Sequence, residues 1–323
     1  MSSPHPVLGH RPVLDALELD LKTGNIAHAY LFAGCRHLGK FTVARWFAEE
    51  LLTVDIEDAV AKDKARLQVQ KLLHPDILVL DKLWMEEVSD DPEDLGKFTN
   101  IPQEHRKKAK AKTDTISIDD VRLLQERLQD VRTGRFRCCV IRSVERMHDE
   151  AVNALLKVLE EPLPGVVFIL TTQALSSLLP TLISRTRVLR FSRLGDRDLT
   201  GLLTGLSQED TRFLLRLAQG APGVIKRLRQ DPDAVRLERQ AFDHAVSFWQ
   251  SRSLQERLRL LTPLHEKNPE ADQFLVHLSL ALRDDVRAQP LRAVDSLHQL
   301  VLGFKTNTSR QLLVQRFALA VGE

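Results

Sequence analysis

Residues 34–41, GCRHLGKF, contain the glycines and the lysine of a phosphate-binding loop of the form G-x-x-x-x-G-K. In a working loop of this kind, backbone N–H groups surround the phosphates and the lysine reaches the terminal phosphates. The next residue is normally a Ser or Thr whose hydroxyl binds magnesium. Gly34, Gly39 and Lys40 are therefore candidate phosphate-binding residues.

Residues that would coordinate magnesium are missing at two positions in the sequence. Phe41 stands where the hydroxyl is needed, and Thr42, one residue on, points about 100° away around a helix. An ATPase of this architecture also needs acidic residues at the end of its third strand, but the sequence IRSVER puts Arg142 and Ser143 there. Glu145 is a rival candidate that we interpret as a surface residue leading into the next helix. We therefore expect a loop that keeps its shape, does not hydrolyse nucleotide and has no metal site.

The elements that would position these residues alternate along the first part of the chain. The apolar run before the loop reads as a strand and FTVARWFAEELL after it as a helix, which is the context that a phosphate-binding loop requires. We expect five strands, at residues 29–34, 76–81, 137–144, 166–172 and 187–191. Strands and helices that alternate in this way indicate a parallel α/β sheet covered on both faces.

The rest of the chain shows helical patterns only. We therefore expect three domains. Residues 1–193 form the α/β domain, residues 194–235 a small helical unit, and residues 236–323 a larger helical bundle. Gly220, Pro222 and Gly223 punctuate the small unit.

A charged segment interrupts the α/β domain at residues 84–114. It contains the acidic stretch EEVSDDPED and the basic stretch EHRKKAKAK, which lie close together in the sequence. The basic run could contact phosphates, but we favour an exposed or disordered insertion whose two halves attract each other.

The composition excludes several classes of protein. Only 5% of the residues are aromatic, which argues against a stacking platform for bases, and a net charge of +2 gives no overall signature of a nucleic-acid binder. The three cysteines form neither a C-x-x-C pair nor a four-ligand zinc set, so we expect reduced thiols and a cytosolic protein. Because there is no leader pattern and no apolar run of about 18 residues, neither export nor a membrane span is indicated.

The order of the motifs is specific. AHAYLFAG, the altered phosphate loop, HPDILVLD, ISIDDVR, VNALLKVLEEP, FILTT and LISRT follow one another over most of the first 190 or so residues. This succession resembles the bacterial clamp-loader AAA+ family of DNA polymerase III, and the delta-prime type of subunit above all. The helical remainder, including GAPG and NTSRQLLVQRFAL, is similar to the lid and collar domains of that family.

The resemblance implies an AAA+ P-loop core, a helical lid and an all-α collar that oligomerises. It implies a pentameric ring, within the polymerase III holoenzyme, that opens the sliding clamp and places it on primed DNA. Gamma or tau ATPase subunits and the delta subunit would be the partners, and they rather than this chain would bind ATP as the cofactor. Family members commonly carry a four-cysteine zinc module, but residues 52–73 contain no cysteine, so zinc is not expected.

The resemblance also assigns a role to residues just before the last strand. In the family a Ser-Arg-Cys motif presents its arginine to the ATP of a neighbouring subunit, and the matching residues here are Ser184 and Arg185, with Thr186 in place of cysteine. An arginine of this kind adds positive charge near the transferring phosphoryl group. The competing interpretation is a surface arginine paired with a carboxylate.

Other residues at positions of interest have structural interpretations. Thr171 and Thr172 match a phosphate-sensing position, but we expect them to cap their strand and the next turn. Lys226 and Arg227 match the sensor region of the lid, although a solvated basic helix end is the simpler interpretation.

Two further functions stay open from the sequence. One is an active gamma-type clamp-loader ATPase in which Lys40 works with Thr42 and Glu145 in a shifted geometry. The other is a solitary AAA+-like adaptor that is unrelated to replication. We favour the non-hydrolysing delta-prime-like subunit.

Overall fold

The computed structural model describes residues 8–80, 115–284 and 291–321. The charged insertion that we predicted at residues 84–114 lies outside these ranges. The chain forms two compact units: the first contains the described residues up to Gly205 together with Gln219–Gly223, and the second contains Leu206–Ala218 and the residues from Val224 onward.

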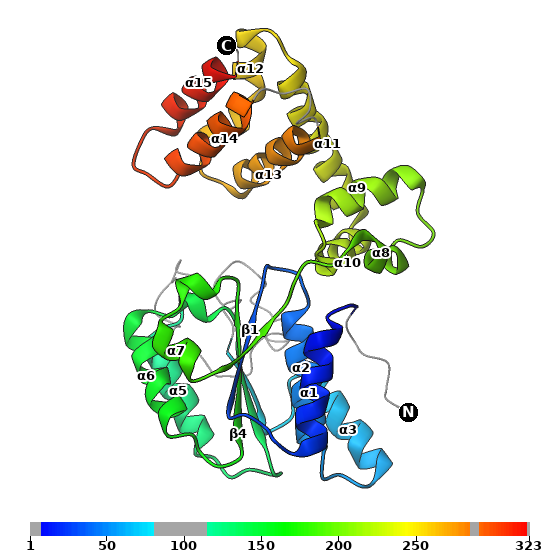
Figure 1. The fold of residues 1–323 in the computed structure, drawn as a ribbon, viewed down its shortest axis with the longest axis vertical. Helices are drawn as coiled ribbons and strands as arrows, with labels where there is room; N and C mark the ends of the chain where they lie inside the picture. The colour runs from blue at the N-terminus through cyan, green and yellow to red at the C-terminus, as the bar shows by residue number, and fades with distance from the viewer. Residues whose placement is uncertain (1–7, 81–114, 285–290, 322–323) are drawn as a thin grey trace. The chain divides into compact units, whose positions relative to one another are not determined.

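A five-stranded sheet is the centre of the first unit (Figure 1). Its strands are β1 (Ala29–Ala33), β2 (Ile77–Leu80), β3 (Arg137–Ile141), β4 (Val166–Thr172) and β5 (Arg187–Arg190). They are all parallel and are arranged in the order β2-β3-β4-β1-β5. All residues of β1 to β4 are buried, which explains why these strands read as continuous apolar runs in the sequence.

Helices cover both faces of the sheet, as predicted. Figure 1 shows α1 (Arg11–Thr23), α2 (Lys40–Leu52) and α3 (Ala59–Gln70) on one face. The other face carries α5 (Ile118–Leu128), α6 (Asp149–Glu160) and α7 (Pro180–Ser184). Two leucines of α6, Leu155 and Leu159, are buried there against the sheet. Short 3-10 turns, η3 (Val144–Arg146) and η4 (Leu175–Ser177), follow β3 and β4.

The third strand is shorter than we predicted. It ends at Ile141 rather than continuing to Val144, because Ser143 adopts a left-handed backbone conformation with φ 54° and η3 begins directly after it. The two cysteines in this strand, Cys138 and Cys139, are fully buried.

A buried ion pair lies at the amino edge of the sheet, where β2 and β3 begin. Arg137, the first residue of β3, is 2.9 Å from Asp76, which precedes β2, and both side chains are almost completely buried. The guanidinium also donates to four backbone carbonyl groups between Arg127 and Val131. This arrangement ties the end of α5 to the first residues of two strands.

The remaining elements are helical, as the sequence predicted. Two short elements, α8 (Asp196–Leu199) and η5 (Thr200–Leu202), complete the first unit. The later helices are α9 (Gln208–Ala218), α10 (Pro222–Gln230), α11 (Pro232–Gln250), α12 (Leu254–Leu260), α13 (Pro269–Asp284), α14 (Leu291–Gly303) and α15 (Arg310–Ala320), with the 3-10 turn η6 (Thr262–His265) after α12. Aromatic residues such as Phe248 and Phe317, whose ring centroids are 5.4 Å apart, form the core of the second unit.

Candidate functional site

The predicted phosphate loop connects β1 to α2 at the carboxyl edge of the sheet. Gly34 is required there by close packing, because a Cβ at this position would lie 2.4 Å from the carbonyl oxygen of Phe191. Gly39 has φ 90°, a left-handed conformation that favours glycine, and it begins α2. The loop therefore keeps the backbone shape that its glycines predict.

Lys40 bonds to the loop itself. Its Nζ donates to the carbonyl oxygens of Gly34 at 2.5 Å and of Cys35 at 2.6 Å. Burial lowers the pKa of Lys40 to about 8; the carboxylate of Glu145 opposes this shift, and the charge of Arg142 adds to it. These two bonds use two of the three N–H donors of the ammonium group and leave one for a phosphate.

Two other segments of the first unit hold the loop from outside. The Nε2 of His10 lies 2.9 Å from the carbonyl oxygen of Leu38, and burial lowers the pKa of His10, which favours a neutral ring that donates this bond. The backbone N–H of Gly223, in the GAPG segment, donates to the carbonyl oxygen of His37 at 2.9 Å. The carbonyl groups of His37 and Leu38 thus accept hydrogen bonds from other segments of the chain.

The two departures from a magnesium site lie together. The guanidinium carbon of Arg142 is 4.4 Å from the centroid of the Phe41 ring, a cation–π contact. Arg142 follows β3 at the carboxyl edge, where the acidic magnesium ligand of an ATPase would stand. A positive charge that stacks on an aromatic ring at this place repels a divalent cation.

Our prediction that Glu145 is a surface residue was wrong. Glu145 is half-buried: one carboxylate oxygen accepts from the backbone N–H of Gln173 at 3.3 Å, and the other is buried with no hydrogen-bond partner in the described part of the chain. Glu145 also acts electrostatically on Lys40. The 3-10 turn η3 directs it back toward the loop, which a count of residues from the strand did not reveal.

Thr171 and Thr172 have the structural roles that we expected. The hydroxyl of Thr171 accepts from the backbone N–H of Ser143 at 3.0 Å and so joins the ends of β3 and β4. The hydroxyl of Thr172 contacts the backbone of Ala174 in the next turn.

Arg185 and Ser184 lie at the end of α7. One terminal nitrogen of Arg185, Nη1, donates to the carbonyl oxygen of Thr181 at 3.0 Å, and the other, Nη2, lies 2.7 Å from Oε1 of Glu160. The Ser184 hydroxyl also donates to the carbonyl oxygen of Thr181, at 3.1 Å. A carboxylate partner for Arg185 was one of the two interpretations open from the sequence, and the structure shows that this partner is Glu160, the last residue of α6.

The sheet separates Arg185 from the phosphate loop of its own chain. Arg185 comes just before β5, and Arg187 of that strand pairs with Tyr30 near the start of β1. The loop instead follows Ala33 at the end of β1. At about 3.3 Å per residue, the distance along β1 from Tyr30 to Gly34, the first residue of the loop, is roughly 13 Å. The structure brings together Gly34, Gly39 and Lys40 and leaves Arg185 and Ser184 at the opposite edge.

Comparison with known proteins places this arrangement in a family. The family described as "DNA polymerase III, delta subunit" matches residues 9–195, more than half of the chain. The chain belongs to this family. Its fold is the parallel α/β core with a helical C-terminal region that the sequence predicted.

Curated relatives of this delta-subunit family member carry the names of other subunits. DNA polymerase III subunit tau/gamma of Haemophilus influenzae is 28% identical over 229 residues, covering 68% of this chain and 29% of that protein. DNA polymerase III subunit tau of Escherichia coli is 26% identical over 313 residues, covering 92% of this chain and 43% of that protein. The chain thus spans less than half the length of these two relatives.

A solved structure with a similar fold is the DNA polymerase III gamma subunit-related protein of Thermotoga maritima. It is 17% identical, with 95% of this chain and 98% of that chain covered and a TM-score of 0.47.

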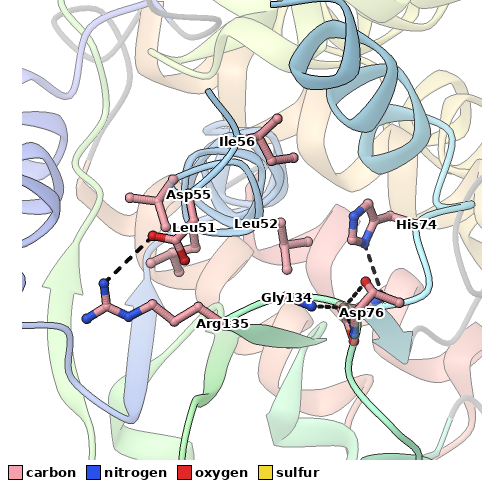
Figure 2. A pocket seen from close by; sticks show the side chains of 10 residues that line it. Leu51, Leu52, Asp55, Ile56, His74, Asp76, Gly134 and Arg135 are labelled. Atoms are coloured by element: carbon pink, nitrogen blue, oxygen red, sulfur yellow. Dashed lines mark hydrogen bonds and ion pairs between the residues drawn. The ribbon is translucent and has the colours of Figure 1, made fainter. Parts of the chain in front are cut away.

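A hollow of about 240 Å³ lies at the amino edge of the sheet, away from the phosphate loop (Figure 2). Arg135 and Asp55, 4.0 Å apart, stand on one side of it, and His74 and Asp76 stand on the other. The carboxylate of Asp76 already accepts hydrogen bonds from Thr133, Gly134 and Arg137. The Asp76 carboxylate is therefore already occupied by hydrogen bonds within the chain.

Residues 52–73, where family members commonly carry a zinc module, contain helix α3 in this member of the family. Within residues 8–80, 115–284 and 291–321, no three His, Cys, Asp or Glu side chains are grouped so that they could hold a metal ion. In the same ranges no helix combines the length and the apolar character needed to cross a membrane.

Lys226 and Arg227 are both exposed on α10, as the simpler interpretation predicted. Arg227 lies 3.6 Å from Glu238 of α11, and its side chain is 59% exposed. This contact directs Arg227 toward another helix of the second unit.

Proposed function

We propose that the chain is a non-hydrolysing, delta-prime-like subunit of the DNA polymerase III clamp loader. One observation carries the proposal: the Arg142 guanidinium stacks on the Phe41 ring where an ATPase would coordinate magnesium. Phosphoryl transfer in this architecture depends on that ion, which bridges the phosphates and neutralises the developing charge. Phe41 replaces the hydroxyl ligand and Arg142 replaces the carboxylate ligand, so the two magnesium ligands on which hydrolysis depends are both lost.

In this proposal the chain acts on the nucleotide of a neighbouring subunit through Arg185, with Ser184 beside it. Arg185 stands at the edge of the sheet opposite its own phosphate loop, so an approach to a nucleotide requires another chain. A guanidinium supplied in this way stabilises the transition-state charge and is worth about 10³ to 10⁵ in rate.

The partners follow from the family and from the names of the relatives. Gamma or tau subunits would bind and hydrolyse ATP, a delta subunit would complete the ring, and the assembly would load the sliding clamp on primed DNA. Residues 194–235 would serve as the lid and residues 236–323 as the oligomerising collar. A cytoplasmic location would follow from this role in replication.

Turnover by the purified chain tests the loss of hydrolysis. We expect no ATP hydrolysis above background with magnesium, and the same result for Lys40→Ala. Magnesium-dependent hydrolysis at ordinary ATPase rates that disappears in Lys40→Ala would contradict the proposal.

Activity of the reconstituted complex tests the role of Arg185. Arg185→Ala should leave this subunit folded and assembled while it slows ATP hydrolysis by the complex at least tenfold, because the charge near the transferring phosphoryl group is lost. Arg190→Ala is the matched control, since Arg190 is an exposed arginine at the other end of β5. Equal rates for the two variants would remove the assignment.

An active gamma-type ATPase is the second candidate. The half-buried carboxylate of Glu145 acts on Lys40, and the curated relatives are named tau and gamma. In that case Glu145→Gln would abolish hydrolysis by the purified chain, whereas our proposal expects no hydrolysis to abolish.

A further inference from the structure

The contact between Arg185 and Glu160 joins two elements far apart in the sequence. Glu160 Oε1 is 2.7 Å from Nη2 of Arg185, a charge-assisted distance. The side chains are 50% and 34% exposed, so the pair is open to solvent and can exchange partners. Nη1 is held at the same time by the carbonyl oxygen of Thr181.

The position of Glu160 is not explained by the stability of its own helix. It is the last residue of α6, and Glu161 follows it. Two carboxylates at the negative end of the helix dipole are unfavourable, and a cation beside them offsets this cost. The end of α6 thus provides a negative site that attracts the guanidinium.

The pair uses the groups that Arg185 would need for a phosphate. A guanidinium binds phosphate best through two N–H groups in a fork, and Nη1 and Nη2 are both engaged within the chain. A carboxylate that stayed beside the guanidinium would also repel the phosphate. Engagement of a neighbouring nucleotide is therefore disfavoured while the Glu160 contact is closed.

We propose that Glu160 is a positioning residue that holds Arg185 withdrawn against α6 until the phosphate of a neighbouring subunit's nucleotide displaces its carboxylate. The proposal rests on the proposed function of Arg185. It adds a competitor for the guanidinium, so Glu160 sets how readily the nucleotide captures Arg185. An exposed ion pair of this kind shifts such an equilibrium by up to about fivefold.

The first test uses the isolated full chain and needs no partner. Phenylglyoxal modifies free guanidinium groups, and the rate at Arg185 is measured by mass spectrometry of its peptide in folded protein. Glu160→Gln should raise this rate by up to about fivefold. Glu161→Gln, which removes an equal charge from the same helix end, should match the wild type. Equal rates for Glu160→Gln and Glu161→Gln would overturn the proposal.

The second test uses the reconstituted complex and separates binding from chemistry. Glu160→Gln should lower the KM for ATP by up to about fivefold with little change in kcat, and Glu160→Asp, which keeps the charge on a shorter arm, should lie between it and the wild type. If Arg185→Ala slows hydrolysis while Glu160→Gln behaves like Glu161→Gln, only this inference fails. If Glu160→Gln slows hydrolysis as Arg185→Ala does, the carboxylate assists delivery and the inference is overturned. If Arg185→Ala has no effect, the proposed function itself fails.

Discussion

The guanidinium carbon of Arg142 lies 4.4 Å from the centroid of the Phe41 ring, so the two residues that depart from an ATPase motif form a single contact. One comes from the start of α2 and the other from the end of β3. A contact of this kind contributes about 0.5–2 kcal/mol, depending on its desolvation. The altered loop is thus a packed arrangement, and under the proposed function a change to either residue alone leaves the other in the way of a metal ion.

Restoring both residues should create a magnesium-dependent nucleotide site. We expect Phe41→Thr combined with Arg142→Asp to bind ATP at least tenfold more tightly with magnesium than without it, because a hydroxyl and a carboxylate then face the ion. Isothermal titration calorimetry with and without a chelator measures the difference.

The single variants are the controls for that double variant. Phe41→Thr keeps the positive charge of Arg142, and Arg142→Asp keeps the aromatic ring, so neither should show the magnesium dependence. A single variant that binds as tightly as the double variant would show that the other residue does not obstruct the metal ion.

Substitutions of the charged residues near Lys40 should shift its pKa in opposite directions. Burial lowers the pKa of Lys40 to about 8; Glu145 is the largest opposing influence, and Arg142 adds to the lowering. Glu145→Gln should therefore move the pKa of Lys40 further below 8, and Arg142→Gln should raise it. Competitive acetylation across a pH series, read on the Lys40 peptide, reports both shifts. Glu150→Gln, an exposed carboxylate on α6, is the control and should leave the profile unchanged.

The same residue predicts the pH dependence of stability. The pKa of Lys40 falls from 10.5 to about 8 on folding, so between these values the unfolded chain holds more protons than the folded one. The free energy of unfolding of the wild type should therefore rise with pH across that window relative to Lys40→Met. Urea denaturation at pH 7.5 and at higher pH measures this difference, and an unchanged difference would contradict the buried charge.

Periodicity and motif spacing predicted the strands and the loop because these depend on local sequence. The fully buried β4 begins and ends where its apolar run does, at Val166 and Thr172. Contacts between residues far apart in the sequence were not predictable in this way. A 3-10 turn places Glu145 near Lys40, and Glu160 at the end of α6 contacts Arg185 at the end of α7. Acidic residues at a helix C-terminus were the one available signal for Glu160, since that position is electrostatically unfavourable without a cation.

The buried pair of Asp76 and Arg137 should dominate the stability of the sheet. Asp76→Asn should lower the free energy of unfolding by about 3–5 kcal/mol, because it leaves a buried guanidinium without its countercharge. Asp130→Asn is the matched control: Asp130 pairs with Arg127 at 3.3 Å on the surface, and the change should cost less than about 1 kcal/mol. Similar losses for both variants, measured by urea denaturation, would contradict this assignment.

The stabilisation by the pair of Asp76 and Arg137 should be lost in acid. Burial alone would raise the pKa of Asp76, but hydrogen bonds from Thr133 and Arg137 outweigh it and leave the pKa below its ordinary value. The stabilisation is therefore fully present above pH of about 4 and is lost as the pH falls through the lowered pKa. The difference between wild type and Asp76→Asn in acid denaturation should shrink in that range.

Glu238 should be the corresponding centre of stability in the second unit. One carboxylate oxygen lies 2.8 Å from Nε2 of the fully buried His277 of α13, and the other lies 3.6 Å from Arg227 of α10. The Nδ1 of His277 is buried and has no hydrogen-bond partner among the described residues, so the bond between Nε2 and Glu238 is the contact that holds the ring. Glu238→Ala should cost about 1.5–3 kcal/mol, because a buried donor loses a charged acceptor.

Hydrogen–deuterium exchange locates that loss. Exchange in α11 and α13 should accelerate in Glu238→Ala, while β1, β3 and β4 of the first unit stay protected, since the affected contacts all lie in the second unit. Asp233→Ala is the control on the same helix, because Asp233 forms an exposed pair with Arg236 at 3.1 Å, which should contribute less than about 1 kcal/mol. Equal acceleration in both variants would mean that the contact with His277 does not hold α11 and α13 together.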